Sequence, residues 1–295
     1  MKLRKKIFSL LFLFQILIHS STSLAREQQS IIPNFESSTP LAGKIWDLNN
    51  RHFITEEVLV SEIAKSDWVL LGENHENEEH HAIEQNLIEA ISDAKKLGNV
   101  ALEMANQKQQ DALDRHRHNR EVTKEELNWS SGWPWDWYGE LVKTALAEAQ
   151  RVIATDLTRD QQMQAYMDSE TELPTGPYRE FMDAILYESH CGKLPKSQLS
   201  NMLRVQIARD KGMHSALINN STNKLDVFIA GTMHTRYDTG IPLVGKLNSK
   251  TVLMVSAGPE MDPGKYIPES YQDNPIADYI IFTPETEPVD HCGEI

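Results

Sequence analysis

Two kinds of hydrophobic pattern alternate along the chain after residue 40. Short, continuous apolar runs, typical of strands buried on both faces, lie at 68–71, 100–104, 152–155, 226–230, 251–257 and 278–282. Longer segments with the helical period separate them, at 78–95, 138–150, 177–190 and 196–218. Strands that alternate with helices predict an α/β fold with a central, largely parallel or mixed sheet flanked by helices.

The first 25 residues differ from the rest and predict a cleavable signal peptide. Four basic residues within positions 2–6 precede an apolar run of about 12 residues, whereas a bilayer span needs about 20. Ser23-Leu24-Ala25 forms a small-x-small cleavage site. An uncleaved N-terminal anchor is the alternative. We therefore expect a periplasmic or secreted protein, with a flexible segment at 26–42 and a single α/β domain at 43–295.

The charge of the chain excludes one class of partner. The formal net charge is −14, and loss of residues 1–25 would remove four basic residues and no acidic ones. Such an acidic protein repels phosphate backbones and anionic lipids. We expect no nucleic-acid partner.

Cys191 and Cys292 are the two cysteines of the chain. In an oxidising compartment, an isolated pair most simply forms a disulfide. Two free thiols that bind a metal ion are the alternative.

One short motif occurs twice, each time directly after an apolar strand. Gly72-Glu73-Asn74-His75 follows WVLL, and Gly231-Thr232-Met233-His234 follows DVFIA. Ligand sites of open α/β sheets lie beyond the carboxyl ends of the strands, so His75 and His234 are expected to share one crevice. The sequence of 100–104, VALEM, places Glu103 on a third buried strand, where a carboxylate is costly unless it is paired or functional.

Glu73, His75, Glu103 and His234 form a set of two carboxylates and two imidazoles. Such a set can supply general acid and base groups, or hold a divalent metal through His75, His234 and Glu73. A structural salt bridge is the alternative for Glu103.

Three further segments carry candidate cofactor-binding residues. His80 and His81 lie on the helix after the first motif, whose early glutamates (Glu76, Glu78 and Glu79) suit a solvated helix start. Gln206 and Arg209 lie on the helix at 196–218, and Arg236 follows the second motif and could pair with an anionic ligand.

The stretch WSSGWPWDWY at 129–138 could wall a large, flat, apolar ligand such as a porphyrin. Trp135 would line that wall, and Tyr138 or a nearby histidine could be the axial ligand. Aromatic packing that stabilises a long loop is the alternative. The chain contains no CxxCH, HExxH or GxSxG motif, which argues against covalent c-type haem, zincin and nucleophile-elbow chemistry.

Several of these segments together resemble the ChaN-like haem-binding uptake proteins. The resemblance rests on LLGENHENEEHH, ALEM, WPWDWY, QIARDKGM and IAGTMHTRYDTGIP, and runs from about Gly43 to Cys292. The wider superfamily includes Tiki proteases, TraB proteins and erythromycin esterases. Many ChaN-like proteins are lipoproteins, and this chain lacks the lipobox cysteine.

The resemblance implies an exported haem-binding protein of haem or iron uptake, with an erythromycin esterase/ChaN-like fold. It also implies a haem-bridged homodimer and a possible outer-membrane receptor or transporter as partner. In the superfamily's enzymes, residues at the positions of Glu73, His75, Glu103 and His234 form the metal or hydrolytic site. A metal-dependent peptidase or esterase is therefore the alternative function, and a structural protein with a vestigial site is a third hypothesis.

Overall fold

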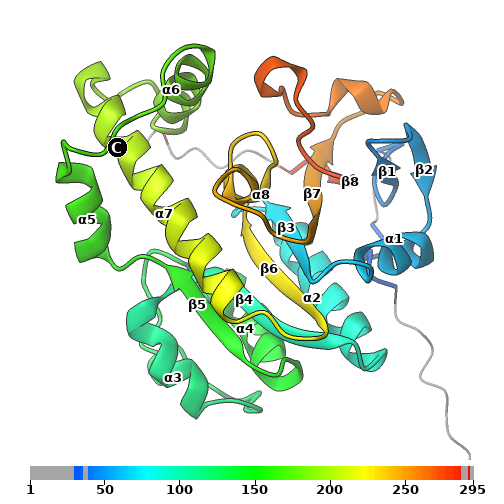
Figure 1. Cartoon of the computed structure of the whole chain (residues 1–295). Helices are drawn as coiled ribbons and strands as arrows, with labels where there is room; N and C mark the ends of the chain where they lie inside the picture. The colour runs from blue at the N-terminus through cyan, green and yellow to red at the C-terminus, as the bar shows by residue number, and fades with distance from the viewer. Residues whose placement is uncertain (1–29, 36–38, 287–291, 293–295) are drawn as a thin grey trace, which may run out of the picture.

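One mixed sheet of eight strands runs through the residues that the computed structural model describes, which are 30–35, 39–286 and 292. The predicted signal peptide, residues 1–25, lies outside these ranges. The strand order is β2-β1-β8-β7-β3-β6-β4-β5. The six strands from β8 to β5 are parallel to their neighbours, and β1 is antiparallel to both β2 and β8. This arrangement confirms the predicted α/β fold (Figure 1).

The strands vary from three to ten residues. They are β1 Ile45–Asp47, β2 His52–Ile54, β3 Trp68–Glu73, β4 Leu97–Asn106, β5 Val152–Asp156, β6 Leu225–Gly231, β7 Ser249–Ala257 and β8 Tyr279–Pro284. All six predicted apolar runs are strands. β1 and β2 have three residues each, too few to show a period of two.

The helices lie on both sides of the sheet (Figure 1). They are α1 Glu56–Ile63, α2 Glu78–Asp93, α3 Gln110–Arg115, α4 Trp135–Glu148, α5 Arg159–Met167, α6 Pro177–Ser189, α7 Leu199–Asn219 and α8 Thr232–Thr235. Single 3₁₀ turns occupy Gln107–Gln109, Lys196–Gln198, Ile241–Leu243, Pro263–Lys265 and Tyr271–Asp273. Within the described ranges, no helix has the length and apolar character needed to cross a bilayer.

The four predicted helices are α2, α4, α6 and α7. Sequence periodicity did not indicate α1, α3, α5 and α8. α3 and α8 are too short to show a stripe, and α5 buries none of its residues. A helix without a buried face carries no amphipathic signal.

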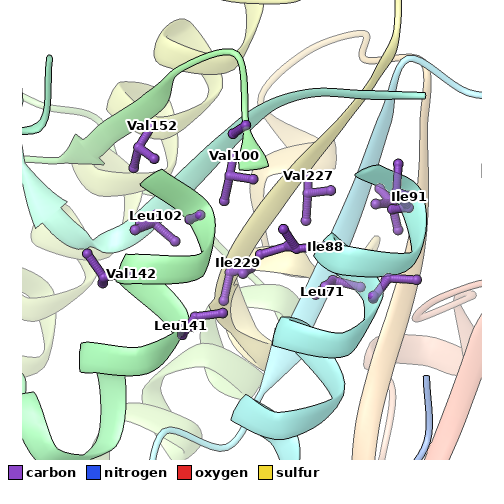
Figure 2. Packing of buried hydrophobic residues seen from close by; sticks show 14 of the residues in the cluster. Leu71, Ile88, Ile91, Val100, Leu102, Leu141, Val142, Val152, Val227 and Ile229 are labelled. Carbon is purple, nitrogen blue, oxygen red and sulfur yellow. The ribbon is translucent and has the colours of Figure 1, made fainter. Parts of the chain in front are cut away.

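Both faces of the central strands are buried, which explains their continuous apolar sequence. Val69 and Leu71 of β3 belong to the core beneath α2 and α4, whereas Trp68 and Leu70 pack on the other face with Met213 of α7. Figure 2 shows the first side, where Ile88 and Ile91 of α2 and Leu141 and Val142 of α4 meet Leu71, Val227 and Ile229 of the strands. Each such side chain contributes about 1.5–3 kcal/mol when fully buried.

The segment expected to be flexible, 26–42, is partly docked on the domain. Ile31, Ile32 and Leu41 are buried in its hydrophobic clusters. The backbone N–H of Ile31 also donates to Glu56 at the start of α1 (2.8 Å). The described part of this segment therefore extends the domain rather than linking it to the leader.

Cys191 and Cys292 form the predicted disulfide, with their Cα atoms 5.6 Å apart. The bridge links the turn after α6 to the C-terminal segment, 101 positions later. Because the two sulfurs are bonded to each other, the alternative of two metal-binding thiols is wrong.

We expect no free thiols when the unfolded, unreduced protein is titrated with a thiol reagent. Replacing both cysteines by serine is expected to lower the free energy of unfolding by up to about 4–5 kcal/mol, because closing a loop of roughly 100 residues restricts the unfolded chain. Urea unfolding with and without reductant measures this loss. The double serine variant is the control, since reductant cannot change its midpoint. Two titratable thiols in the wild-type protein would contradict the bridge.

Candidate functional site

The two GxxH motifs meet at the carboxyl ends of neighbouring strands. β3 and β6 are paired in parallel, with Glu73 opposite Gly231, and β4 pairs with the other side of β6. Glu73 ends β3, Glu103 lies near the end of β4, and His234 lies in α8, one turn beyond β6. The structure therefore brings Glu73, His75, Glu103 and His234 into one site.

Glycine is required in both motifs because the chains approach closely. A Cβ on Gly231 would lie 2.6 Å from Nε2 of His75, and a Cβ on Gly72 would lie 2.4 Å from Oγ1 of Thr235. Gly231 of the second motif thus makes room for His75 of the first motif. Gly72 of the first motif makes room for Thr235, the residue directly after the second motif. This reciprocal packing explains why the same pattern occurs twice.

Glu73 is the centre of one buried half of the site. Its Oε1 lies 2.8 Å from Nδ1 of His75 and accepts from the hydroxyl of Tyr138 (2.9 Å), and its Oε2 lies 2.9 Å from Nε2 of His81. Burial alone would raise the pKa of Glu73, but the hydrogen bonds and charges of His75 and His81 outweigh it and lower the pKa to about 2. Glu73 is therefore a carboxylate at neutral pH.

Glu84 on α2 is a second buried carboxyl group beside Glu73, which the sequence interpretation missed. Burial and the neighbouring Glu73 charge raise the pKa of Glu84 well above its usual range, which favours the neutral form of this carboxyl group. The sequence did contain a signal for this burial: Glu84 directly follows Ile83 and lies three residues before Leu87, so it falls inside the apolar stripe of the helix.

Glu103 anchors the other half through Arg209 of α7. The guanidinium donates from Nη2 to Glu103 (2.6 Å) and from Nε to Asp156 (2.8 Å), and its Nη1 lies 3.0 Å from Nε2 of His234. The second oxygen of Glu103 accepts from the N–H of Gly231 (2.7 Å). Although burial opposes it, the charges of His234 and Arg209 hold the pKa of Glu103 well below its usual range.

His234 is fixed from its other side by α7. Its Nδ1 lies 2.6 Å from Oδ1 of Asp210 and 3.2 Å from Nε2 of Gln206. Burial lowers the pKa of His234 and the carboxylates of Glu103 and Asp210 raise it, with a net value of about 9. Gln206 and Arg209, which the sequence suggested as cofactor-binding residues, therefore contact the residues of this site, as do Asp156 and Asp210. Asp156 is the last residue of β5. The rule that ligand sites lie at strand ends, which was applied to Glu103, would also have indicated Asp156.

His75 forms the accessible edge between the two halves. Its side chain is 34% exposed, whereas the side chains of Glu73 and Glu103 are at most 2% exposed. Nε2 of His75 lies 3.8 Å from Oε2 of Glu103, and the imidazole packs edge-on against the indole of Trp133 with 4.7 Å between ring centroids. His75 is thus the imidazole of this site that an incoming ligand can reach most directly.

The geometry does not support the predicted metal centre. Among the described residues, no group of three or more histidine, cysteine, aspartate or glutamate side chains is arranged to hold a metal ion. Arg209 already neutralises Glu103 and Asp156 and lies against His234, where a bound cation would be repelled. His75, His234 and Glu73 instead take protein groups as partners.

Two of the predicted cofactor-binding histidines and Tyr138 are internal. His80 accepts from the N–H of Asn74 (2.9 Å) and lies 3.0 Å from the hydroxyl of Thr283, and burial lowers its pKa to about 3. His81 is 6% exposed and faces Glu73. Tyr138 is fully buried, and burial together with the charge of Glu73 raises its pKa, so it remains a hydrogen-bond donor.

Arg236 is not part of the site. Its guanidinium is buried, donates twice to Asp238 (2.8 and 2.7 Å), and donates once to the carbonyl of Glu269 (2.7 Å). Arg236 therefore pairs with a carboxylate of the protein rather than with the anionic ligand that the sequence suggested.

Beside Trp133, which packs against His75, the tryptophan-rich segment borders two cavities; His75 itself lines neither of them. One, of about 600 Å³, is lined by Trp129, Trp133, Pro134, Trp135 and, at its rim, Lys124. The other, of about 320 Å³, is polar and is lined by Trp133, Glu103, Asp156 and Arg159, among others. Trp133 belongs to both, and Trp135 also packs edge-on against Trp129. The segment therefore packs internally and walls a cavity at the same time.

The two buried glutamates make opposite predictions for stability. Glu73, with its lowered pKa, stabilises the fold above pH 4.5, and this contribution is lost as the pH falls towards 2. Glu73→Gln should lower the free energy of unfolding at pH 7 by about 2–3 kcal/mol. Glu84, with its raised pKa, costs stability above pH 4.5, so Glu84→Gln should raise the free energy of unfolding at pH 7 and leave it unchanged below pH 4.5.

Urea unfolding between pH 3 and pH 8 measures both effects, and each variant is the matched control for the other. The same sign of change for both variants at pH 7 would contradict the assigned ionisation states.

Comparisons with known proteins bear on the family and the fold of this chain. The model of the family "Haem-binding uptake, Tiki superfamily, ChaN" matches residues 59–244, more than half of the chain. A search of curated proteins finds no match. A solved structure of ChaN from Campylobacter jejuni, described by its cofacial haem binding, is similar with a TM-score of 0.65 and 22% identity. That match covers 80% of this chain and 95% of the other.

An erythromycin esterase in an open conformation is less similar, with a TM-score of 0.49 and 12% identity over 77% of this chain and 93% of the esterase. The similarity to the Campylobacter structure shows the fold, and the match to the family model shows the family to which the chain belongs. This chain belongs to the ChaN family of haem-binding uptake proteins in the Tiki superfamily.

Proposed function

We propose that this protein binds haem at the opening beside His75 and takes part in haem or iron uptake outside the cytoplasm. Membership of the haem-binding ChaN family is the observation that carries the proposal. The similarity in fold to the Campylobacter protein with cofacial haem binding supports it.

The residues at this opening suit a porphyrin. A porphyrin is flat and apolar, with two carboxylates at one edge. Trp129, Trp133 and Trp135 supply apolar surface along the cavity of about 600 Å³. The exposed cations Lys124 and Arg159, one at each cavity, are suited to pair with propionates.

We propose that His75 is the residue that would hold the haem iron. Tyr138, His80 and His81 are buried and bonded inside the protein, whereas His75 is partly exposed. Glu73 accepts from Nδ1 of His75, which leaves the lone pair on Nε2 and orients the ring. Haem, when bound, would supply an iron atom that takes one protein ligand here. Glu73, Tyr138 and Trp133 would position that ligand.

A haemin titration of the protein, followed by the Soret band, tests this assignment. We expect saturation near one haem per chain, and at least a tenfold weaker affinity for His75→Ala because the residue that would hold the iron is lost. His52→Ala, an exposed histidine on β2, is the matched control and should titrate like wild type. Tyr166→Phe, at a tyrosine on the exposed helix α5, tests whether a tyrosine side chain holds the iron instead of a histidine.

If His75→Ala kept the wild-type Soret titration and Tyr166→Phe lost haemin binding, the assignment to His75 would be wrong and the iron-binding residue would lie on α5. No saturable binding by the wild-type protein would contradict haem binding itself.

We also propose export by residues 1–25, residence in the periplasm or medium, and a haem-bridged homodimer that delivers haem to an outer-membrane receptor or transporter. Light scattering during the same titration would detect the dimer. If two porphyrins stack between two chains, the mass doubles as haem saturates. A monomer at full haem occupancy would rule the bridge out.

Hydrolysis of an ester or peptide is a second candidate function, favoured by the Glu73–His75 pair. A buried carboxylate at Nδ1 and an accessible Nε2 are the arrangement of a general base. His75 would take a proton from water, while Arg209 and the protonated His234 would supply positive charge beside Glu103. This chemistry uses the protein's own groups, unlike the metal-dependent version that the sequence suggested.

A screen of nitrophenyl esters and short peptides, with chelator present, tests this alternative. Any activity should fall by a factor of about 10²–10⁴ in His75→Ala, and His52→Ala should retain it. Activity that survives in His75→Ala would come from elsewhere.

A further inference from the structure

Three asparagines of the chain lie two positions before a serine or threonine, with no proline between them. They are Asn128 in Asn128-Trp129-Ser130, Asn219 in Asn219-Asn220-Ser221, and Asn220 in Asn220-Ser221-Thr222. This pattern is the acceptor sequence for N-linked glycans in exported proteins. The structure distinguishes the three asparagines. An acceptor side-chain amide must be exposed, must lack hydrogen-bond partners within the protein, and must lie on a segment that an enzyme can bind.

Asn128 meets these conditions. It lies outside the helices and strands, between α3 and α4, with φ of 49°, and it is exposed. Its neighbours are anchored: Leu127 is completely buried, and the indole of Trp129 donates to the carbonyl of Trp133 (2.9 Å). The backbone of Asn128 is also bonded. Within the described residues, its side-chain amide has no hydrogen-bond partner, so this group alone projects from a fixed turn.

The other two acceptor sequences are less suitable. The amide nitrogen of Asn220 donates to the carbonyl of Ala216 (2.8 Å), and its oxygen accepts from Arg151 (3.2 Å). Asn219 is the last residue of α7, and its amide donates to Ser215 (3.3 Å). An enzyme would have to break these bonds and unwind a helix end first.

The residue two positions before each asparagine distinguishes them further. Glu126 precedes Asn128 and is exposed, whereas Leu217 and Ile218 precede the other two. Glu126 thus offers a transferase an exposed charged group beside the acceptor amide, which the other two sequences lack. A transferase that binds this carboxylate would select Asn128 in this chain.

We propose that Asn128 is an N-glycosylation site, modified after export by an oligosaccharyltransferase that recognises Glu126. Nδ2 of Asn128 forms a bond to C1 of the sugar, and the bond from C1 to the phosphate oxygen of a lipid-linked oligosaccharide pyrophosphate breaks. The lipid pyrophosphate leaves, and the proton from Nδ2 passes to a base of the enzyme. The site rests on the export included in the proposed function, and is independent of haem binding.

The position of this glycan has a structural consequence. Asn128 lines the same cavity of about 600 Å³ as Trp129, Trp133 and Trp135. A sugar at Asn128 would stand at the rim of the apolar surface on which we place the porphyrin. The tryptophan-rich segment would then carry a polar cover beside its apolar wall.

Expression of the full chain, with its own leader, in bacteria that carry such a transferase and its lipid-linked donor tests the proposal. We expect the intact mass of the exported protein to increase by one oligosaccharide, with the modified peptide containing Asn128. Asn128→Gln should abolish the increase, and Glu126→Gln should reduce the occupied fraction at least tenfold. Asn219→Gln and Asn220→Gln are the matched controls and should keep full occupancy.

An exported, leader-free chain without the adduct would overturn the proposal, as would an adduct on Asn219 or Asn220 instead. A chain that retains residues 1–25 would overturn it through its export step, and the mass distinguishes this case. A haemin titration of Glu126→Gln, a residue that lines neither cavity, is expected to match wild type and keeps the test separate from that of haem binding.

Discussion

The buried carboxylate of Glu73 is the interaction on which the site depends. A carboxylate removed from water is costly unless charged or hydrogen-bonded partners surround it. Here the partners come from three elements: His75 from the turn after β3, His81 from α2 and Tyr138 from α4. The site therefore forms only when α2 and α4 are docked on the sheet, which couples the packing of the core to the orientation of His75.

Arg209 has the same importance in the other half of the site. Its guanidinium compensates Glu103 and Asp156 and contacts His234, so the acidic and imidazole groups are neutralised inside the protein. A site rich in histidine and carboxylate is thereby stable without a metal ion. Its one accessible imidazole, His75, then faces an apolar wall of tryptophans, and this combination suits a flat aromatic ligand with an anionic edge.

Much of the fold followed from local pattern. Six apolar runs predicted the six parallel strands, because a strand covered on both faces must be apolar throughout. The short strands β1 and β2 and the exposed helix α5 escaped detection, since neither length nor burial marks them. The paired GxxH motifs predicted that His75 and His234 share one crevice, and the structure brings both to the same edge of the sheet. The sequence did not indicate which way other candidate side chains point: His80 and Arg236 are both internal.

The sequence by itself determined which chemical groups this protein carries and that they follow the carboxyl ends of strands, because those properties depend on neighbours along the chain. Tertiary structure decided how the groups are used. The placement of β6 between β3 and β4 brings residues 73, 103 and 234 together, and α7 inserts Arg209 among them. Arg209 and Glu103 are 106 positions apart, so burial, charge compensation and access are set by packing that no local pattern records.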